Sequence, residues 1–212
     1  PCRGRRRAFD PRPRRAAYSG PPAAAGAAGQ GSRRGDDVGQ AIAPDFARLK
    51  AQLDEIQTAL RAARLDGWLL YDLHARNGVA GALLGHGDLT RRYFVYLPAR
   101  GVPTAVIHGI EESPWEHWPY ERTTYVAWPE LDDALKAVLT GSRRVAMEFS
   151  ERDAVPAVDV VPAGVVELVR ATGVQVVSSG DLLTRFYARW SADDLASHRR
   201  AAVVMAETAH AV

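Results

Sequence analysis

Polar side chains that can bind anions or exchange protons are concentrated in the short stretch Asp72-Leu-His-Ala-Arg-Asn77. It directly follows Trp68-Leu-Leu-Tyr71, an apolar run that is typical of a buried strand. Because α/β proteins build their binding sites at the carboxyl ends of strands, this stretch is a candidate site. The competing interpretation is that Asp72 simply caps a helix.

Two arginines stand in a similar position before a later apolar run. Arg91 and Arg92 precede the run 93–97. Guanidinium groups bind carboxylates in a bidentate geometry, so this pair could meet a carboxylate or a partner surface. Ordinary solvated surface charge is the alternative.

No known catalytic motif is present elsewhere in the sequence. The six histidines (74, 86, 108, 117, 198 and 210) include no pair at helical metal-ligand spacing. The glycines form neither a dinucleotide-binding nor a Walker pattern. A cluster of acidic residues, a histidine and two tryptophans could hold a cation, form a packing or docking surface, or lie in a solvated loop; its members are Glu111, Glu112, Trp115, Glu116, His117 and Trp118. We therefore predict no catalytic residue and no metal ligand in this chain.

The charge of the chain is unevenly distributed. Residues 1–44 hold nine arginines and three aspartates, a net charge of +6, so the remaining 168 residues carry −4 of the total of +2. The segment 1–44 is rich in Arg, Ala, Gly and Pro and lacks periodicity, which predicts a disordered tail. The basic pI therefore does not indicate a nucleic-acid-binding domain, and deleting 1–44 would separate binding by the tail from binding by the domain.

The location of the protein can be narrowed only slightly. No apolar run reaches the roughly 20 residues that span a bilayer, and no signal-peptide pattern occurs. A single cysteine excludes an internal disulfide framework and suits a reducing compartment. We expect no membrane partner and a cytoplasmic protein.

The remaining chain alternates helical and strand patterns. We predict helices over 46–65 (followed by Gly67), 73–84, 129–139 and 160–172, a helical turn over 181–187, and a further helix from Ser191. Strands are predicted over 68–71, 93–97, 104–108, 123–128, 144–149 and 174–177. Because a hairpin sits among otherwise helix-separated strands, the fold class is α/β with a mixed sheet of about six strands flanked by helices.

The order of these segments resembles a known family. The segments Asp66-Gly-Trp-Leu-Leu-Tyr-Asp72, Gly85–Pro98 with Leu-Thr-Arg-Arg-Tyr-Phe, and Arg144-Val-Ala-Met-Glu-Phe-Ser150 are similar to the creatinase-like N-terminal domain of the pita-bread metallopeptidases. This family contains aminopeptidase P, Xaa-Pro dipeptidase (prolidase) and creatinase, and the similarity is greatest to aminopeptidase P-like proteins. The segment from Ala188 to His198 resembles the junction with the catalytic domain.

The resemblance implies a domain plan and a function. After the predicted tail (1–44), it implies an N-terminal α/β domain (45–189) and the first helix (190–212) of a pita-bread domain that is missing here. The sequence starts at Pro1 without an initiator Met and ends abruptly at Ala-His-Ala-Val, so both ends resemble cuts. The full-length enzyme would be a metalloaminopeptidase that hydrolyses Xaa-Pro peptides with two divalent metals (Mn, Co or Zn), while this piece binds no cofactor and is inactive. The domain would support oligomerisation and control access to the active site.

The resemblance also suggests site residues. Relatives use the N-terminal domain for substrate or partner-subunit contacts, and the candidates here are His74, Asn77, Arg91 and Arg92. Expected partners are the catalytic domain, further copies of the chain and a peptide substrate, and no nucleic acid. The alternatives are a stand-alone α/β dimerisation or interaction module and a creatinase-type amidinohydrolase. A stop codon after Val212 would favour the module, whereas the apolar face of the last helix (Leu195, Ala202, Met205 and Ala209), which lacks an obvious partner within this chain, argues against it.

Overall fold

The computed structural model describes residues 46–85 and 89–210. The tail predicted for 1–44 lies outside the described residues. The domain boundaries predicted at residues 45 and 190 stay predictions.

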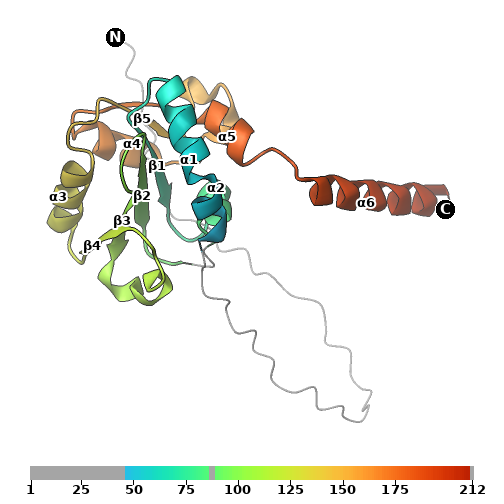
Figure 1. Ribbon diagram of the computed structural model, residues 1–212, viewed down its shortest axis with the longest axis horizontal. Coiled ribbons are helices and arrows are strands. Elements are labelled where there is room, and N and C mark those ends of the chain that lie inside the picture. Colours follow the sequence, from blue (N-terminus) through green and yellow to red (C-terminus); the bar gives the residue numbers. More distant parts are fainter. Residues whose placement is uncertain (1–45, 86–88, 211–212) are drawn as a thin grey trace, which may run out of the picture. The chain divides into compact units, whose positions relative to one another are not determined.

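A six-stranded mixed sheet forms the centre of the domain (Figure 1). Its order is β4-β3-β2-β1-β5-β6. The middle strands β1 and β2, and β2 and β3, pair antiparallel, whereas β3–β4, β1–β5 and β5–β6 are parallel. The strands are β1 (Gly67–Asp72), β2 (Tyr93–Pro98), β3 (Thr104–His108), β4 (Glu121–Tyr125), β5 (Arg144–Met147) and β6 (Gln175–Ser178). The predicted α/β class and mixed sheet are confirmed.

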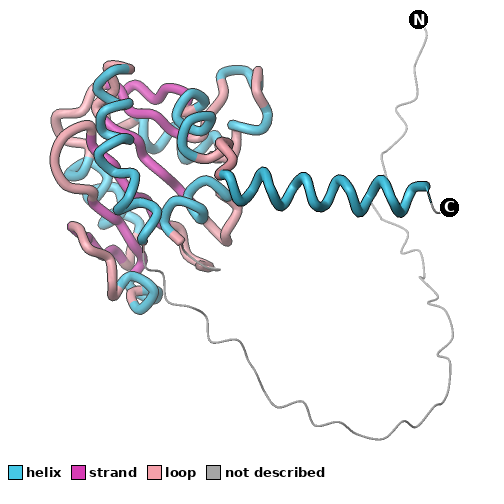
Figure 2. Tube along the Cα trace, turned by 45° about the vertical axis from the view of Figure 1, so that its right-hand side comes forward, coloured by secondary structure: helices cyan, strands magenta, loops and turns pink. Residues whose placement is uncertain are grey.

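Helices cover both faces of this sheet, as Figure 2 shows by the strands running between helical layers. One hydrophobic cluster lies between the sheet and α1, α2 and α5, and a second lies between the sheet and α3 and α4. The α-helices are α1 (Ala47–Ala62), α2 (Gly78–Leu84), α3 (Trp128–Val138), α4 (Ala163–Arg170), α5 (Gly180–Phe186) and α6 (Ala192–His210). Short 3-10 turns are η1 (Gly109–Glu111), η2 (Ser113–Trp115), η3 (Glu151–Asp153) and η4 (Pro156–Val158).

Strand β1 is buried along its whole length because both of its faces are covered. Trp68 and Leu70 contribute to one hydrophobic cluster, and Leu69 and Tyr71 to the other. Side chains of a strand alternate between faces, so a two-sided core requires an unbroken apolar run. This explains why the sequence signal for β1 was clear.

The sequence predicts that Gly67 ends the first helix, and the structure shows that it does not. Helix α1 ends at Ala62, with Ala63 as its C-cap, and Gly67 is the first residue of β1. A Cβ atom on Gly67 would lie 2.2 Å from Cε2 of Tyr96 on the neighbouring strand. Glycine is needed here for close approach of a side chain, and not for a helix end.

The helix predicted over 73–84 begins later than expected, because α2 starts only at Gly78. His74 and Ala75 adopt left-handed backbone angles, with φ values of 59° and 51°. Asp72 and Asn77 hold this turn through hydrogen bonds to main-chain N–H groups. Asp and Asn compete with the helix in this way, which is why they favour turns and caps.

Helix α6 begins with a reciprocal capping box. The Ser191 Oγ accepts from the Asp194 N–H (3.1 Å), and the Asp194 carboxylate accepts from the Ser191 N–H (3.0 Å). This matches the predicted helix start. The helix has no buried residue among those described, and Val203, Val204 and Met205 are exposed.

Among the described helices, none is both long and apolar enough to cross a lipid bilayer.

Candidate functional site

A hollow of about 260 Å³ lies at one end of the sheet. The carboxyl ends of β1, β3 and β4 and the amino end of β2 meet there, because β2 runs antiparallel to its neighbours β1 and β3. It is lined by Tyr71, Leu73, His74, Thr90, Arg91, Arg92, His108 and Tyr125. Three of the four predicted site residues, His74, Arg91 and Arg92, therefore come together.

His74 is presented by the strained turn between β1 and α2. One carboxylate oxygen of Asp72 accepts hydrogen bonds from the N–H groups of Arg76 (2.8 Å) and Asn77 (2.9 Å). The two consecutive left-handed residues, His74 and Ala75, are costly for side chains with a Cβ, so the surrounding contacts must fix this geometry. His74 itself is exposed and faces the hollow.

Asn77, the fourth predicted contact residue, does not line this hollow and lies inside the protein. It is 3% exposed. Its side-chain oxygen accepts from the N–H groups of Val79 and Ala80, and its amide donates to the Tyr71 carbonyl (2.8 Å) and to Glu148 (2.7 Å). Both hydrogen-bonding groups of the amide are thus occupied inside the protein, and Asn77 is the N-cap of α2.

The buried residue Glu148 fixes the Asn77 side chain by accepting a hydrogen bond from its amide. It follows β5 and is 0% exposed. One carboxylate oxygen accepts from the Trp68 indole (2.6 Å) and the Ser179 hydroxyl (3.2 Å), and the other accepts from Asn77 (2.7 Å). Burial raises the pKa of Glu148 to about 7, and the hydrogen bonds from Trp68, Asn77 and Ser179 oppose this rise.

A continuous series of hydrogen bonds links Glu148 to the turn that carries His74. Glu148 holds Asn77, and the main-chain N–H of Asn77 is bound by Asp72, which also closes the turn that carries His74. A buried glutamate from a distant strand therefore supports the exposed histidine at the hollow. Sequence reasoning missed Glu148, because a glutamate at the end of a strand usually faces solvent.

The main chains of Arg91 and Arg92 are held by hydrogen bonds; the Arg91 side chain is exposed and that of Arg92 is half-buried. Glu111 accepts from the N–H groups of Thr90 (2.8 Å) and Arg91 (2.9 Å). The Arg92 carbonyl accepts from the Tyr125 hydroxyl (2.8 Å). The Arg92 guanidinium lies over the Trp128 ring, 4.8 Å from its centre.

The acidic cluster predicted over 111–118 has a structural role. Glu111 braces the loop before β2, and its hydrogen bonds from Thr90 and Arg91 lower its pKa against the effect of burial, which acts in the opposite direction. Trp115 and Trp118 are buried and pack with Phe46. Of the alternatives for the tryptophans, packing is confirmed. No group of three potential metal ligands occurs among the described residues.

His108 is a further basic residue that the sequence reasoning did not select. It ends β3 and its ring packs edge-on against Tyr125, with the ring centres 5.1 Å apart. Its Nδ1 accepts from the Ile110 N–H (3.1 Å), so the neutral ring carries its proton on Nε2. Its position at the carboxyl end of a strand was the signal that could have identified it.

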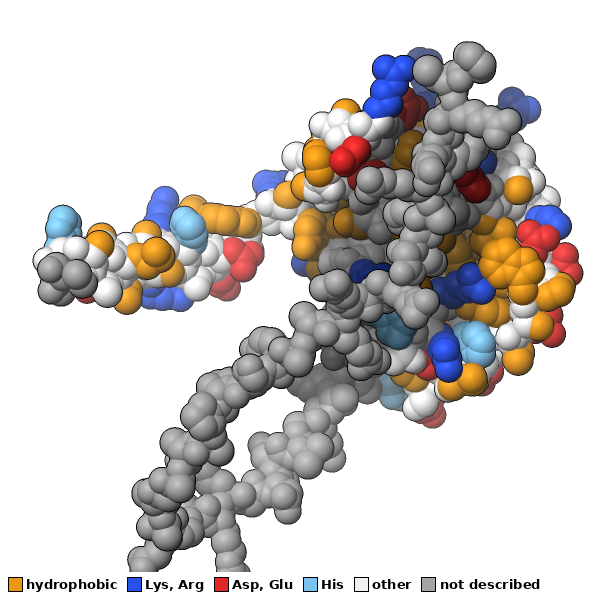
Figure 3. Space-filling model, turned by 180° about the vertical axis from the view of Figure 1, so that it is seen from behind, with side chains coloured by type: hydrophobic (Ala, Val, Ile, Leu, Met, Phe, Trp, Pro, Cys, Tyr) orange, Lys and Arg blue, Asp and Glu red, His pale blue; other side chains and the backbone are white. Residues whose placement is uncertain are grey.

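The hollow suits recognition of an anion. Two arginines and two histidines line it, and none of the described residues that line it carries a carboxylate. Guanidinium and imidazole N–H groups bind carboxylates through charge-assisted hydrogen bonds. Figure 3 shows basic and histidine side chains gathered on one face of the molecule. The arrangement can bind and orient a carboxylate.

Comparison with solved structures identifies the fold. The chain is similar to dipeptidase PepE from Mycobacterium ulcerans (22% identity, TM-score 0.52), with 71% of this chain matching 39% of that protein. It is also similar to the creatinase/prolidase N-terminal domain of an X-Pro dipeptidase from Streptococcus pyogenes (16% identity, TM-score 0.51), with 63% of this chain matching 97% of that domain. Recombinant prolidase from Thermococcus sibiricus is a third (14% identity, TM-score 0.55; 76% and 43% covered).

These comparisons confirm the predicted resemblance at the level of fold, which is that of a creatinase/prolidase N-terminal domain. The chain spans about two fifths of the dipeptidase from Mycobacterium ulcerans. No family model matches the chain. No curated protein matches it either.

Proposed function

We propose that this chain is the N-terminal, non-catalytic domain of a metal-dependent peptidase that acts on Xaa-Pro peptides. The observation that carries the proposal is the match to nearly the whole length of an isolated X-Pro dipeptidase N-terminal domain. In this proposal a separate catalytic domain holds two divalent metals (Mn, Co or Zn), which activate a bridging water for hydrolysis. The present domain supports oligomerisation and access to that site.

The hollow lined by His74, Arg91 and Arg92 could serve this role by binding a carboxylate. We assign His74, Arg91 and Arg92, together with His108, to binding a carboxylate of the peptide substrate or of a neighbouring subunit. Glu111 and Tyr125 bind the main chains of Arg91 and Arg92, so the backbone that carries the two guanidinium groups is fixed. Anchoring lowers the entropy lost when the carboxylate binds.

A stand-alone dimerisation module is the second candidate. It is favoured by the exposed apolar side chains of α6, namely Val203, Val204 and Met205. Both the module and the peptidase proposal predict oligomers. Light scattering of the purified chain therefore distinguishes them only in combination with an activity assay. The reading frame that encodes Val212 is therefore the direct test. The peptidase proposal requires that it encode a further domain with two Asp, one His and two Glu as metal ligands.

The site assignment is tested in the full-length enzyme. Replacing Arg91 and Arg92 by Ala should raise the KM for a Xaa-Pro substrate by roughly 10- to 100-fold, the effect of losing hydrogen bonds from charged groups. Arg152→Ala, at an exposed arginine in η3, is the matched control and should leave KM unchanged. An unchanged KM together with an unchanged oligomeric state in the Arg91/Arg92 variant would refute the site. Manganese-dependent hydrolysis by residues 1–212 alone would refute the non-catalytic assignment.

A further inference from the structure

A second, larger hollow of about 510 Å³ lies at the opposite end of the sheet. It is formed where β1 begins and β2 ends, beside the end of α1 and the loop after α3. Its charged side chains are Arg61, Arg64, Asp66 and Arg100. No part of the function proposed above uses this end of the sheet.

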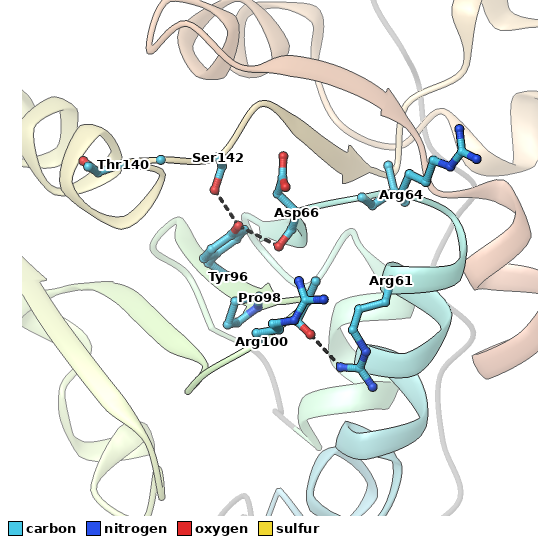
Figure 4. Close-up of a pocket in the computed structure, with 11 residues that line it drawn as sticks. Arg61, Arg64, Asp66, Tyr96, Pro98, Arg100, Thr140 and Ser142 are labelled. Atoms are coloured by element: carbon cyan, nitrogen blue, oxygen red, sulfur yellow. Dashed lines mark hydrogen bonds between the residues drawn. The ribbon is translucent and has the colours of Figure 1, made fainter.

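The guanidinium groups of this hollow are not neutralised by the nearby carboxylate. One oxygen of Asp66 accepts from the N–H groups of Arg143 (2.7 Å) and Arg144 (2.8 Å). These two main-chain hydrogen bonds lower the pKa of Asp66, so it stays ionised but is directed at the backbone. In Figure 4 the Asp66 carboxyl group points away from Arg61 and Arg100.

Arg61 is fixed in place, whereas Arg100 is free to adjust. Arg61 donates to the Ala99 carbonyl (2.7 Å) and to the Thr58 hydroxyl (2.8 Å). Figure 4 shows the Arg100 guanidinium near Arg61, with Arg64 extending outward at the rim. The Ser142 and Tyr96 hydroxyls, 2.7 Å apart, add polar groups at the inner wall.

The charge at this end of the sheet favours an anion with more than one negative charge. Three arginines line the hollow: Arg61, Arg64 and Arg100. The charges of Arg143 and Arg144 lie outside its lining but near enough to Asp66 to help lower its pKa. Asp66 offsets one charge, and the carboxyl ends of α1 and α3 together contribute about one more negative charge. With all five arginines counted, a net charge of about +3 remains at this end of the sheet, which a single carboxylate would leave largely uncompensated.

We propose that this hollow binds a small phosphorylated anion of the diphosphate or triphosphate class. Arginine is suited to phosphate because its planar N–H pairs match two phosphate oxygens. The volume exceeds what one phosphate group fills, so it leaves room for linked phosphates. The site is independent of the carboxylate-binding hollow, so either assignment can fail alone.

The test is calorimetric titration of the full 212-residue chain with inorganic pyrophosphate at low salt. Arg100→Gln should weaken binding about tenfold, and Arg61→Gln at least as much. Because Arg100 makes no hydrogen bond among those described here, its variant should fold normally and keeps the test interpretable if Arg61→Gln unfolds. The matched control is Arg152→Gln, at an exposed arginine outside the hollow.

The competing ligands define the outcomes. Tighter binding of ADP than of pyrophosphate would support the site with a nucleotide as the source, and equal binding would support it with free diphosphate as the source. Citrate binding as tightly as pyrophosphate would overturn the phosphate class. Equal binding by wild type, Arg100→Gln and Arg61→Gln would also overturn the proposal, because the anion would then be held by other arginines such as those of residues 1–44.

Discussion

Glu148 should make the stability of this domain fall as the pH rises from mildly acidic to neutral. Its carboxyl group is 0% exposed, and burial raises its pKa to about 7 from an ordinary value of 4.5. The folded state therefore holds a proton that the unfolded state releases. Stability from this proton is full below about pH 4.5 and is lost as the pH rises through 7.

The size of this effect follows from the shift. At about 1.4 kcal/mol per pKa unit, Glu148 alone lowers the free energy of unfolding by roughly 3 kcal/mol between pH 4.5 and pH 8. Asp66 and Glu111 act in the opposite direction, since their lowered pKa values make stability fall in acid. Their effect is confined to lower pH, so the interval from pH 5 to 8 isolates Glu148 from these two carboxylates.

The substitution Glu148→Gln removes the titration and nearly preserves the shape. At pH 5 the variant should be less stable than the wild type by about 1–3 kcal/mol, because the Gln amide cannot accept all the hydrogen bonds from Trp68, Asn77 and Ser179. Between pH 5 and pH 8 the wild type should lose roughly 2–3 kcal/mol because it then buries a charge, so that at pH 8 the variant should be about as stable as the wild type or more stable.

Urea unfolding of both proteins at pH 5, 6, 7 and 8 measures the deficit. Glu151→Gln, at an exposed glutamate three residues away, is the control and should differ from the wild type by the same small amount at every pH. A Glu148→Gln deficit that stays constant from pH 5 to pH 8 would refute the reasoning. It would mean that the three donated hydrogen bonds keep Glu148 ionised throughout.

The fold allows two further predictions by thermal unfolding. Gly67→Ala should destabilise the domain by about 1–3 kcal/mol because its Cβ would collide with the Tyr96 ring. The control Gly164→Ala, in α4 with open space around it, should be neutral or stabilising by up to about 1 kcal/mol. Equal effects of the two substitutions would contradict the close-packing argument. Asn77→Ala should cost roughly 3 kcal/mol or more, since it removes a helix cap and the hydrogen bonds that Asn77 donates to one carboxylate oxygen of Glu148 and to the Tyr71 carbonyl. A loss below about 1 kcal/mol would show that Asn77 supports little of the turn.

The strands and the first hollow could be predicted because their signals are local. Strand β1 is a continuous apolar run, and β2 and β3 form a hairpin with turn residues between them. The pairing of Asp72 with Tyr93 then places the residues after β1 beside those before β2. His74 and Arg92 meet for this reason, although they lie far apart in the sequence.

The support of the site could not be predicted, because it depends on contacts between distant segments. Glu148 and Asn77 are 71 residues apart, and their hydrogen bond exists only because β5 pairs with β1 on the side away from β2. The polarity of Asn77 makes it a candidate contact residue, but the same hydrogen-bonding capacity also suits a buried helix cap. The sequence pattern alone does not distinguish the two uses.

A common feature explains why both ends of the sheet are cationic even though the ordered domain is rich in acidic residues. Asp66, Asp72 and Glu111 each lie close to arginines in sequence or space, yet each carboxylate accepts hydrogen bonds from main-chain N–H groups. Acidic side chains that stabilise turns in this way do not form side-chain ion pairs with their neighbours among the hydrogen bonds described here. The arginines therefore retain their capacity for anions, and at both ends of the sheet an external carboxylate or phosphate would offset the positive charge, as we propose.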